Sequence, residues 1–316
     1  MRQDQRSRIR SLKAPRFINP AARNIYYFEI LMEDNAVPTY PTLRLYDQGP
    51  SVRILQMNLY GLNYTYNGLR ITGVFDRRTQ EVVENFQAEH RLTPDGIVGP
   101  VTWNALLGEV KRVQNQLNAN NFFVGSADGI YGPRTTNAVT RFQSVNGLDM
   151  SGTVTPRTRQ QLFNPNPPDD YSTRPTSFSL SSLHPRVAEL AQQFLDLAEE
   201  NGLEVRIIEA FRSWDDQDAR YAQGRTAPGQ IVTDAMGGDS YHNWGLAFDA
   251  APVVNGEIAW DDTEKFDLMG ELGQQVGLEW GGNWTSYRIN LVDKPHFQYT
   301  FGLSTQQLLE GARPPR

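Results

Sequence analysis

Two histidines and an aspartate in the last third of the chain have side-chain types and spacings that could bind a metal ion. His242 lies seven residues before Asp249, and His296 follows later in the chain. Seven residues separate Cα atoms by about 10.5 Å on a helix and by about 23 Å on a strand, whereas a zinc bond is only about 2.0–2.2 Å long. Neither regular element brings the first two side chains to one ion, so we expect the chain to fold back between them, at Gly245.

A loop carrying His242 and a strand carrying Asp249 satisfy this geometry, with His296 on a neighbouring strand. Two histidines and one carboxylate leave a fourth zinc position open for water, which is typical of catalytic rather than structural sites. Asp293 lies three residues before His296, and Pro295 interrupts the strand alternation that would point its side chain away from the metal. We therefore expect Asp293 to take a proton from water and to deliver it to a leaving amine.

Arg212 is the expected cation that stabilises a developing oxyanion or a substrate carboxylate. Structural interpretations of the same residues remain open: Asp249 as a helix cap, His242 as a hydrogen-bonded loop residue, and Arg212 in a surface ion pair. The other two histidines, His90 and His184, are expected to be structural, because the first precedes a turn and the second begins a helix.

The composition excludes several kinds of site. The chain has 316 residues and no cysteine, so disulfides, cysteine-ligated zinc, iron–sulfur clusters and thiol nucleophiles are excluded. No run of 18 apolar residues exists, so we expect no transmembrane segment. The N-terminus is basic but has no apolar region behind the charges, so we expect synthesis in the cytoplasm without a Sec signal peptide.

The charge is distributed unevenly along the chain. Residues 1–163 carry 19 basic and 13 acidic side chains, a net charge of +6, whereas residues 164–316 carry 11 and 23, a net charge of −12. Seven basic residues lie within residues 1–23, so residues 1–42 are interpreted as a basic extension of unknown role, in which residues 24–42 could form a strand. The extension lacks interleaved aromatic residues and the rest of the chain is acidic, so we expect no nucleic-acid partner.

A tandem duplication occupies most of the first half of the chain, at an offset of 56 to 58 residues. Apolar residues at i, i+3, i+4 and i+7 predict helices in both copies, and Asp-Gly and Gly-Pro pairs mark turns between them. We therefore expect two units of about three short helices each, residues 43–107 and 108–163. The matched positions include Gln56 and Gln114, Gly73 and Gly129, Phe86 and Phe142, Leu92 and Leu148, Gly96 and Gly152, and Leu106 and Leu162.

The remainder of the chain has a different pattern. Residues 164–183 are rich in Pro, Ser and Asp and lack periodicity, which predicts a linker. From residue 184 an apolar stripe predicts a helix that ends at Asn201-Gly202, and residues 203–208 alternate as a strand does. Strand-like and helix-like segments follow, ending in a short helix near residues 304–311. Residues 184–316 therefore predict an α+β domain.

The segments 223–249 and 293–298 closely resemble the L-alanyl-D-glutamate peptidases, which belong to the D-Ala-D-Ala metallopeptidase superfamily and occur in phage endolysins and bacterial autolysins. The resemblance extends over about residues 184–303 and implies an antiparallel sheet and one Zn2+ ion. It also implies roles for six residues: His242, Asp249 and His296 as zinc ligands, Asp293 as catalytic base, Arg212 as the oxyanion-stabilising group and Ser240 as a substrate contact.

The two repeats resemble peptidoglycan-binding domains of the three-helix type. Residues 92–106 are close to that family's ending, whereas the second copy has Ser151-Gly152 there and no Trp. The resemblances together imply a multidomain chain with two small all-α domains followed by an α+β zinc peptidase. The expected activity is metal-assisted hydrolysis of the L-Ala–D-Glu bond of peptidoglycan stem peptides, at the cell wall, in phage lysis or autolysis. The alternatives are a D,D-carboxypeptidase of the same superfamily and a non-catalytic, wall-binding structural component.

Overall fold

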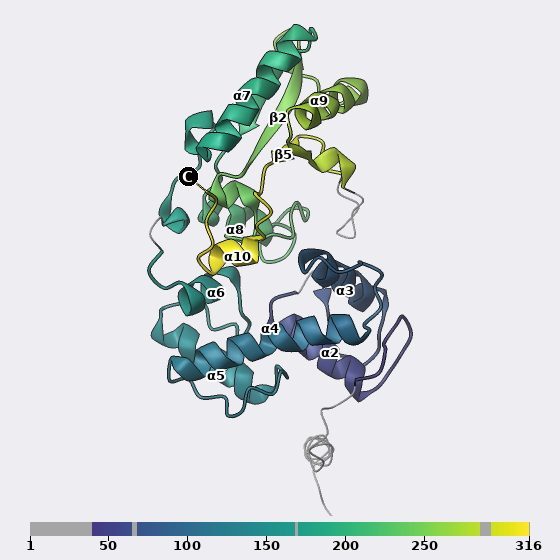
Figure 1. The fold of residues 1–316 in the computed structure, drawn as a ribbon, viewed down its shortest axis with the longest axis vertical. Helices are drawn as coiled ribbons and strands as arrows, with labels where there is room; N and C mark the ends of the chain where they lie inside the picture. Colours follow the sequence, from purple (N-terminus) through teal and green to yellow (C-terminus); the bar gives the residue numbers. More distant parts are fainter. Residues whose placement is uncertain (1–39, 65–67, 168–169, 285–291, 316) are drawn as a thin grey trace, which may run out of the picture. The chain divides into compact units, whose positions relative to one another are not determined.

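The computed structural model describes residues 40–64, 68–167, 170–284 and 292–315 (Figure 1). The helical repeats and the α+β region lie within one unit, residues 41–316. Most of the basic extension, including residues 24–39 of the strand expected there, lies outside the described residues. None of the helices in the described ranges combines the length and the apolar character needed to cross a membrane.

The repeats form a row of helices joined by turns. Proline occupies the first turn of four of them, where its missing N–H leaves no hydrogen bond unmade. The exception, the helix that begins at Arg77, is capped by Asp76, whose side chain accepts a hydrogen bond from the backbone nitrogen of Thr79 at 2.8 Å. The helices are α2 (Pro50–Gly61), α3 (Arg77–Glu89), α4 (Pro100–Ala119), α5 (Pro133–Val145) and α6 (Pro156–Phe163).

The boundary expected between residues 107 and 108 falls inside the continuous helix α4. Its buried residues extend from Thr102 to Leu117, so α4 is both the last helix of the first repeat and the first helix of the second. The two units therefore share a helix instead of each having three of their own. A sequence period shows which segments are similar, but it does not show that a helix stops where the similarity restarts.

A buried glutamine fixes each of the glycine turns. In the second repeat, the side-chain oxygen of Gln114 accepts a hydrogen bond from the nitrogen of Gly129 at 2.9 Å, and its nitrogen donates to Thr135 Oγ1 at 3.1 Å. Gly129 has a φ of 83°, in the left-handed region that favours glycine. The same arrangement recurs at Gln56, Gln87 and Gln143.

The expected linker, residues 164–183, is wrong in its second half. From residue 170 onward the segment packs against the α+β region: the ring of Tyr171 lies 5.3 Å from that of Trp244, and Ser177 forms a β-bridge with Phe211. The composition correctly predicts little regular structure, but the aromatic contacts are formed with residues far along the chain. The segment contains the short helices η3 (Tyr171–Thr173) and η4 (Leu180–Ser182).

The α+β region is built on a sheet in which every strand pair is antiparallel, as expected. The strands β1 (Val205–Glu209), β2 (Ala247–Val254), β5 (His296–Gln298) and β4 (Glu279–Trp280) lie in that order, and β3 (Glu257–Ile258) pairs with β2. The helices are α7 (Pro185–Glu200), α8 (Trp214–Ala222), η5 (Tyr241–Trp244), α9 (Thr263–Gln275), η6 (Gly281–Asn283) and α10 (Thr305–Leu309). The expected helices near 184–201 and 304–311 and the strand near 203–208 are confirmed.

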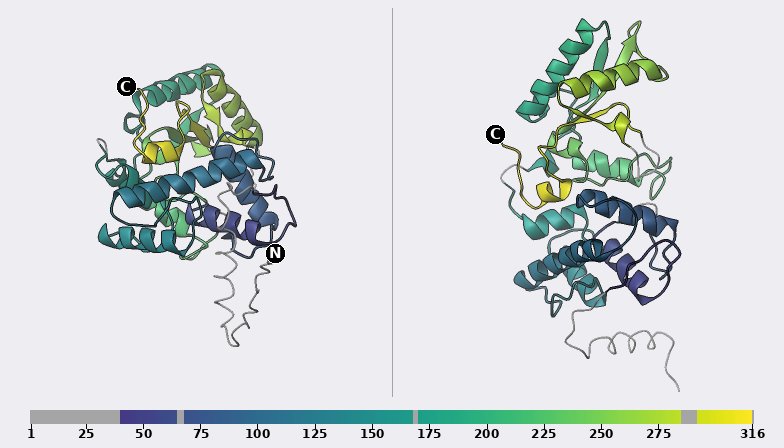
Figure 2. Two further views of the ribbon diagram at one scale, coloured as in Figure 1. Left: turned by 60° about the horizontal axis from the view of Figure 1, so that its bottom comes forward. Right: turned by 45° about the vertical axis from the view of Figure 1, so that its right-hand side comes forward.

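Helices α7 and α9 pack against each other and against the sheet (Figures 1 and 2). Phe194 of α7 lies 4.9 Å from Phe297 of β5, which stacks on Phe248 of β2 at 5.6 Å. Gly273 of α9 permits this close packing, because a Cβ there would lie 2.3 Å from the Phe297 ring. Side chains alternate along strands, so Asp249, His296 and Gln298 point away from these helices.

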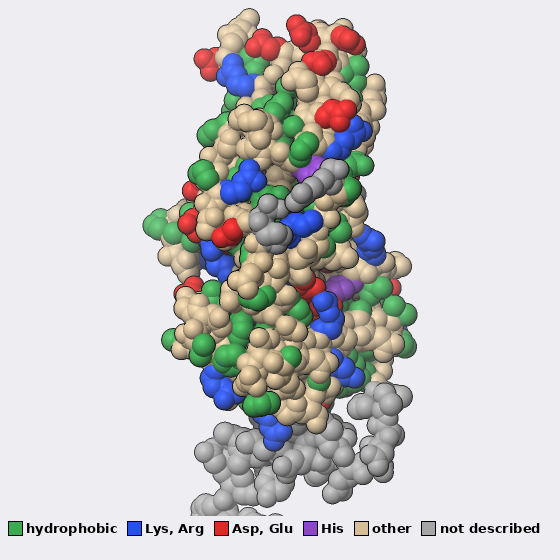
Figure 3. Space-filling model, turned by 60° about the vertical axis from the view of Figure 1, so that its left-hand side comes forward, with side chains coloured by type: hydrophobic (Ala, Val, Ile, Leu, Met, Phe, Trp, Pro, Cys, Tyr) green, Lys and Arg blue, Asp and Glu red, His purple; other side chains and the backbone are tan. Residues whose placement is uncertain are grey.

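Charged residues join the repeats to the α+β region, whose net charges are opposite in sign. The side chain of Arg159 on α6 is 6% exposed, and its Nη1 lies 2.7 Å from Glu310, just after α10. Arg112 of α4 also binds Glu310, and Arg157 binds Asp215 and Asp218. On the face drawn in Figure 3, basic and acidic side chains lie close together across the middle, whereas acidic ones prevail at one end.

Candidate metal centre and active site

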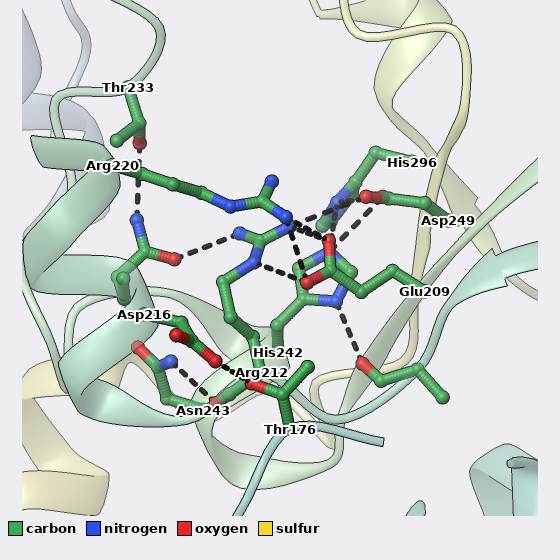
Figure 4. A network of polar contacts seen from close by, with 12 residues as sticks. Thr176, Glu209, Arg212, Asp216, Arg220, Thr233, His242, Asn243, Asp249 and His296 are labelled. Carbon is green, nitrogen blue, oxygen red and sulfur yellow. Dashed lines mark hydrogen bonds and ion pairs between the residues drawn. The ribbon is translucent and has the colours of Figure 1, made fainter. Parts of the chain in front are cut away.

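His242, Asp249 and His296 converge (Figure 4) and line a cavity of about 890 Å³. They come from η5, β2 and β5, so a short helix and two adjacent strands position them, close to the loop and strands expected from the sequence. One ligand atom from each residue lies within 4.8 Å of the other two. The interpretation of Asp249 as a helix cap is wrong, since it lies within β2.

Gly245 reverses the chain between the first two of these residues. It follows η5 with a φ of 66°, in the left-handed region, and β2 begins two residues later. A Cβ at this position would lie 3.2 Å from the carbonyl oxygen of Ser182. The expectation that the chain folds back at Gly245 is therefore confirmed, and both conformation and space favour glycine there.

The separations between the three side chains fit a tetrahedral metal site. His242 Nε2 lies 3.1 Å from both Asp249 Oδ1 and His296 Nδ1, and His296 Nδ1 lies 3.4 Å from Asp249 Oδ1. Zinc bonds of about 2.0–2.1 Å at tetrahedral angles place neighbouring ligand atoms about 3.3–3.4 Å apart. The ligand set thus already has nearly the spacing that a zinc ion requires.

Hydrogen bonds behind the two histidines orient their rings. His242 Nδ1 donates to the carbonyl oxygen of Ala210 at 2.9 Å, and His296 Nε2 donates to Gln298 Oε1 at 3.0 Å. The amide of Gln298 is itself oriented, because its nitrogen donates to Glu279 at 2.8 Å. These bonds place the proton of each neutral ring away from the site, so two nitrogen lone pairs face one carboxylate. Three electron-pair donors in contact fit a bound cation.

The charges of the site influence one another strongly. Burial alone raises the pKa of Asp249, but His242 and His296 outweigh it and hold that pKa well below its usual range. Burial lowers the pKa of His296, and the adjacent Asp249 outweighs this and raises it. Burial is also the largest influence on Asp293 and raises its pKa, so that this carboxyl group holds a proton more readily than an exposed one.

Asp293 lies at the same cavity, in the turn that precedes β5. Its backbone nitrogen donates to the carbonyl oxygen of Gly281 at 3.1 Å, and its own carbonyl oxygen accepts from the nitrogen of His296 at 3.1 Å. A Cβ on Gly281 would lie 2.4 Å from that carbonyl oxygen. Asp293 is therefore held by a turn instead of by strand alternation, as the position of Pro295 predicts.

Arg212 is 7% exposed, so the interpretation as a surface ion pair is wrong. Its Nε donates to Glu209 at 2.9 Å, its Nη1 donates to Gln217 at 2.8 Å, and its Nη2 lies 3.4 Å from Asp249 Oδ2 (Figure 4). Burial lowers the pKa of Arg212, but the bonds to Glu209 outweigh it and raise that pKa. The guanidinium is thus a fixed positive charge beside the metal ligands.

The residues that support the site were not predicted from the sequence. Gln298 had a detectable signal, because it lies two residues after His296 and so shares its face of a strand. Glu209 and Gln217 belong to no motif, and only the register that places Glu209 opposite Asp249 brings Glu209 to the site. Arg220 adds a second cation to Glu209 at 3.0 Å.

The remaining candidate residues, Ser240, His184 and His90, lie next to the ends of helices. Ser240 immediately precedes η5 and lines the cavity, and its backbone nitrogen donates to Asn243 Oδ1 at 3.3 Å. His184 caps the N-terminus of α7 and His90 follows the C-terminus of α3, with its ring 4.1 Å from that of Phe86. Both histidines thus lie at helix ends, in keeping with the structural roles expected for them.

Comparisons with protein families match both parts of the chain. Residues 180–303 match the D-alanyl-D-alanine carboxypeptidase family. Residues 48–106 and 108–162 each match a peptidoglycan binding domain. The matched regions correspond to the α+β region and to the two repeats.

Individual proteins resemble the α+β region. A peptidoglycan L-alanyl-D-glutamate endopeptidase, CwlK of Bacillus subtilis (strain 168), is 42% identical over 127 residues, 37% of this chain and 74% of that protein. An L-alanyl-D-glutamate peptidase of Listeria phage A118 is 31% identical over 128 residues, 39% of this chain and 40% of that protein. Among solved structures, the L-Ala D-Glu endopeptidase ChiX of Serratia marcescens aligns with 39% of this chain and 84% of its own, at 23% identity and a TM-score of 0.30.

Proposed function

The chain belongs to the D-alanyl-D-alanine carboxypeptidase family, and on that basis we propose that it is a zinc peptidase that hydrolyses the L-Ala–D-Glu bond of peptidoglycan stem peptides. The observation that carries the proposal is the convergence of His242, Asp249 and His296 at the spacing of a tetrahedral site. The bond is chosen because the Bacillus and phage relatives carry that specificity in their names.

The three converging side chains would hold the zinc ion and leave one position open. A zinc ion bound in this way acidifies water and polarises a carbonyl group. Asp293 would accept the proton that water loses on attack and return it to the leaving amine. Its raised pKa suits this second step, because a carboxyl group that holds its proton can act as an acid.

Arg212 would stabilise the negative charge that develops on the scissile carbonyl oxygen, or a carboxylate of the substrate. Its bonds to Glu209 and Gln217 hold the guanidinium in place before the substrate arrives. Such preorganisation favours catalysis, because the charge does not have to reorient during the reaction. Ser240 at the cavity is a proposed substrate contact.

We also propose that different parts of the chain bind peptidoglycan and cleave it. Residues 43–107 and 108–163 would bind peptidoglycan, and residues 184–316, together with the part of the expected linker that packs on them, would cut it. The basic residues 1–42 would attract anionic polymers of the wall or a membrane surface. The protein would act at the cell wall, in phage lysis or autolysis.

Mass spectrometry of digested peptidoglycan tests the bond that is cleaved. The proposal predicts peptides that begin with D-Glu and glycan strands that retain L-Ala. Release of terminal D-Ala would instead identify a D,D-carboxypeptidase, the activity named in the matching family description.

The third alternative is a wall-binding protein without catalysis. It is tested with Asp293→Ala in the zinc-loaded full chain, because that substitution removes the proposed proton carrier but leaves the three ligands. The peptidase predicts clearing of wall suspensions by the wild type and a rate lowered at least about a hundredfold in the variant. Binding without clearing by both proteins would establish the non-catalytic alternative.

A further inference from the structure

We propose that the first repeat forms one wall of the substrate cleft and binds the glycan part of peptidoglycan while the metal centre binds the scissile amide. This inference rests on the proposed function and deepens it. The cavity that contains the metal ligands is lined on one side by Asn85 and Arg91 of the first repeat, and on the other by Trp284 and His296. Its volume of about 890 Å³ lies within the range of ligand sites, roughly 300–1,000 Å³.

Asn85 provides the strongest sign that a ligand is expected on the repeat side. It is 3% exposed, and its side-chain nitrogen has no hydrogen-bond partner in the part of the chain that the structure describes. Buried amide groups are nearly always hydrogen-bonded, because a lone buried donor is unfavourable. A carbonyl or hydroxyl oxygen of a ligand in the cavity would satisfy this donor.

The second repeat has no such residue at the matching position. An offset of 56 residues aligns Phe86 with Phe142 and therefore Asn85 with Arg141. Arg141 is exposed, does not line the cavity, and donates to the carbonyl oxygen of Phe123 at 3.4 Å. The two copies thus differ at this position: Asn85 of the first lines the cavity, whereas the second contributes other residues, Val154, Pro156 and Arg159.

Contacts between the parts hold the first repeat at the cavity. Arg91 donates to the carbonyl oxygen of Gly302, and Asn63 donates to the sulfur of Met236 at 3.5 Å. The buried Arg159 of the second repeat forms an ion pair with Glu310, the residue that follows α10. These contacts connect the basic repeats to the acidic α+β region, and residues of both line the cavity.

The chemistry of the proposed substrate requires a sugar contact close to the metal. The L-Ala of a stem peptide is linked to the sugar through only a short lactyl group, and one residue spans at most about 3.6 Å. The glycan must therefore lie beside the scissile bond, where the cavity offers hydrogen-bonding and aromatic groups. Trp284 is 38% exposed, with its ring 4.8 Å from that of His296, and presents a surface on which a sugar can pack.

The test compares two substrates of the full-length, zinc-loaded protein: a stem peptide attached to its disaccharide, and the same peptide without sugar. Asn85→Ala is expected to lower kcat/KM for the sugar-linked peptide about three- to tenfold, mainly through KM, and to leave the free peptide unchanged. Asn85→Asp, which removes the donor but keeps the shape, should show the same selective loss. Arg141→Ala, the matched position of the second repeat, should change neither rate.

Equal rates in the wild type and both Asn85 variants would overturn the inference, and so would an equal loss on both substrates. Calorimetric binding of the sugar-linked peptide separates this failure from that of the proposed function. If the wild type cleaves neither substrate, the proposed function fails. Weaker binding by Asn85→Ala would then still support the glycan contact, whereas unchanged binding would overturn it.

Discussion

Asp249 on β2 lies directly opposite His296 on β5, paired across two antiparallel strands. The register of the sheet therefore sets the separation of these two ligands, and both point away from the helices that pack against Phe248 and Phe297. Only His242 lies outside the sheet, on the short helix η5, which Gly245 ends. Two of the three ligands are thus positioned by the sheet of the α+β region.

Replacing Gln298 with Leu is expected to weaken zinc binding. The side-chain oxygen of Gln298 accepts a hydrogen bond from His296 Nε2. Loss of such a hydrogen bond behind a metal ligand typically lowers metal affinity about 10- to 100-fold. Competition with a zinc indicator measures the affinity, and circular dichroism checks the fold. Gln192→Leu, on the exposed surface of α7, is the control. Unchanged affinity in Gln298→Leu would show that the Gln298 hydrogen bond does not support the site.

Replacing Glu209 with Gln should destabilise the fold and lower catalysis together. Glu209 is the carboxylate that binds the buried Arg212 and also Arg220, and its loss leaves a buried charge poorly paired. We expect the free energy of unfolding in urea to fall by about 1–3 kcal/mol. At a temperature where the variant is fully folded, kcat should still be reduced. Glu257→Gln, on the exposed strand β3, should change neither, and a normal kcat in Glu209→Gln would argue against a fixed guanidinium.

Acidification should destabilise the first repeat through His90. Burial is the largest influence on His90 and lowers its pKa, despite the nearby carboxylates of Glu109 and Glu89. Protons therefore bind the unfolded chain more readily, so this contribution to stability is present above the ordinary pKa of about 6.5 and is lost as the pH falls below it. Urea unfolding from pH 8 to 5 should show a smaller loss of stability in His90→Gln than in the wild type. Parallel pH profiles would contradict the assignment.

The glutamine that fixes the turn at Gly129 should be important for the repeats. Gln114→Leu leaves the buried nitrogen of Gly129 and the hydroxyl of Thr135 without this partner. The expected loss in the free energy of unfolding is about 1–3 kcal/mol. Gln161→Leu, at a less buried position of α6, is the control. Equal stabilities of the two variants would disprove the role of the Gln114 hydrogen bonds.

Much of the metal site could be predicted from the sequence, because its signals are local. The His242–Asp249 spacing and the intervening Gly245 predict a loop followed by a strand, and a short helix followed by a strand forms. The support of Arg212 was not predicted, because no motif marks Glu209 and Gln217, which lie three and five residues from it along the chain. The pairing of β1 with β2 is what places this group beside Asp249.

The helices of the repeats could be predicted from the sequence, but their boundaries could not. Helical periodicity and Gly-Pro pairs identify the helices, but they do not show that α4 continues through the boundary between the copies. Likewise, a Pro-rich composition predicts irregular structure near residue 171, whereas the packing of Tyr171 on Trp244 depends on tertiary contacts.

The most direct test is hydrolysis of purified peptidoglycan by the full chain after chelation and stepwise return of zinc, followed as the appearance of peptides that begin with D-Glu. We predict that chelation abolishes the activity, that it returns in proportion to zinc up to one equivalent per chain, and that zinc does not restore it in Asp249→Asn. Asp196→Asn, an exposed carboxylate on α7, should behave as the wild type. Full activity of the chelated protein, or wild-type activity of Asp249→Asn, would contradict the account.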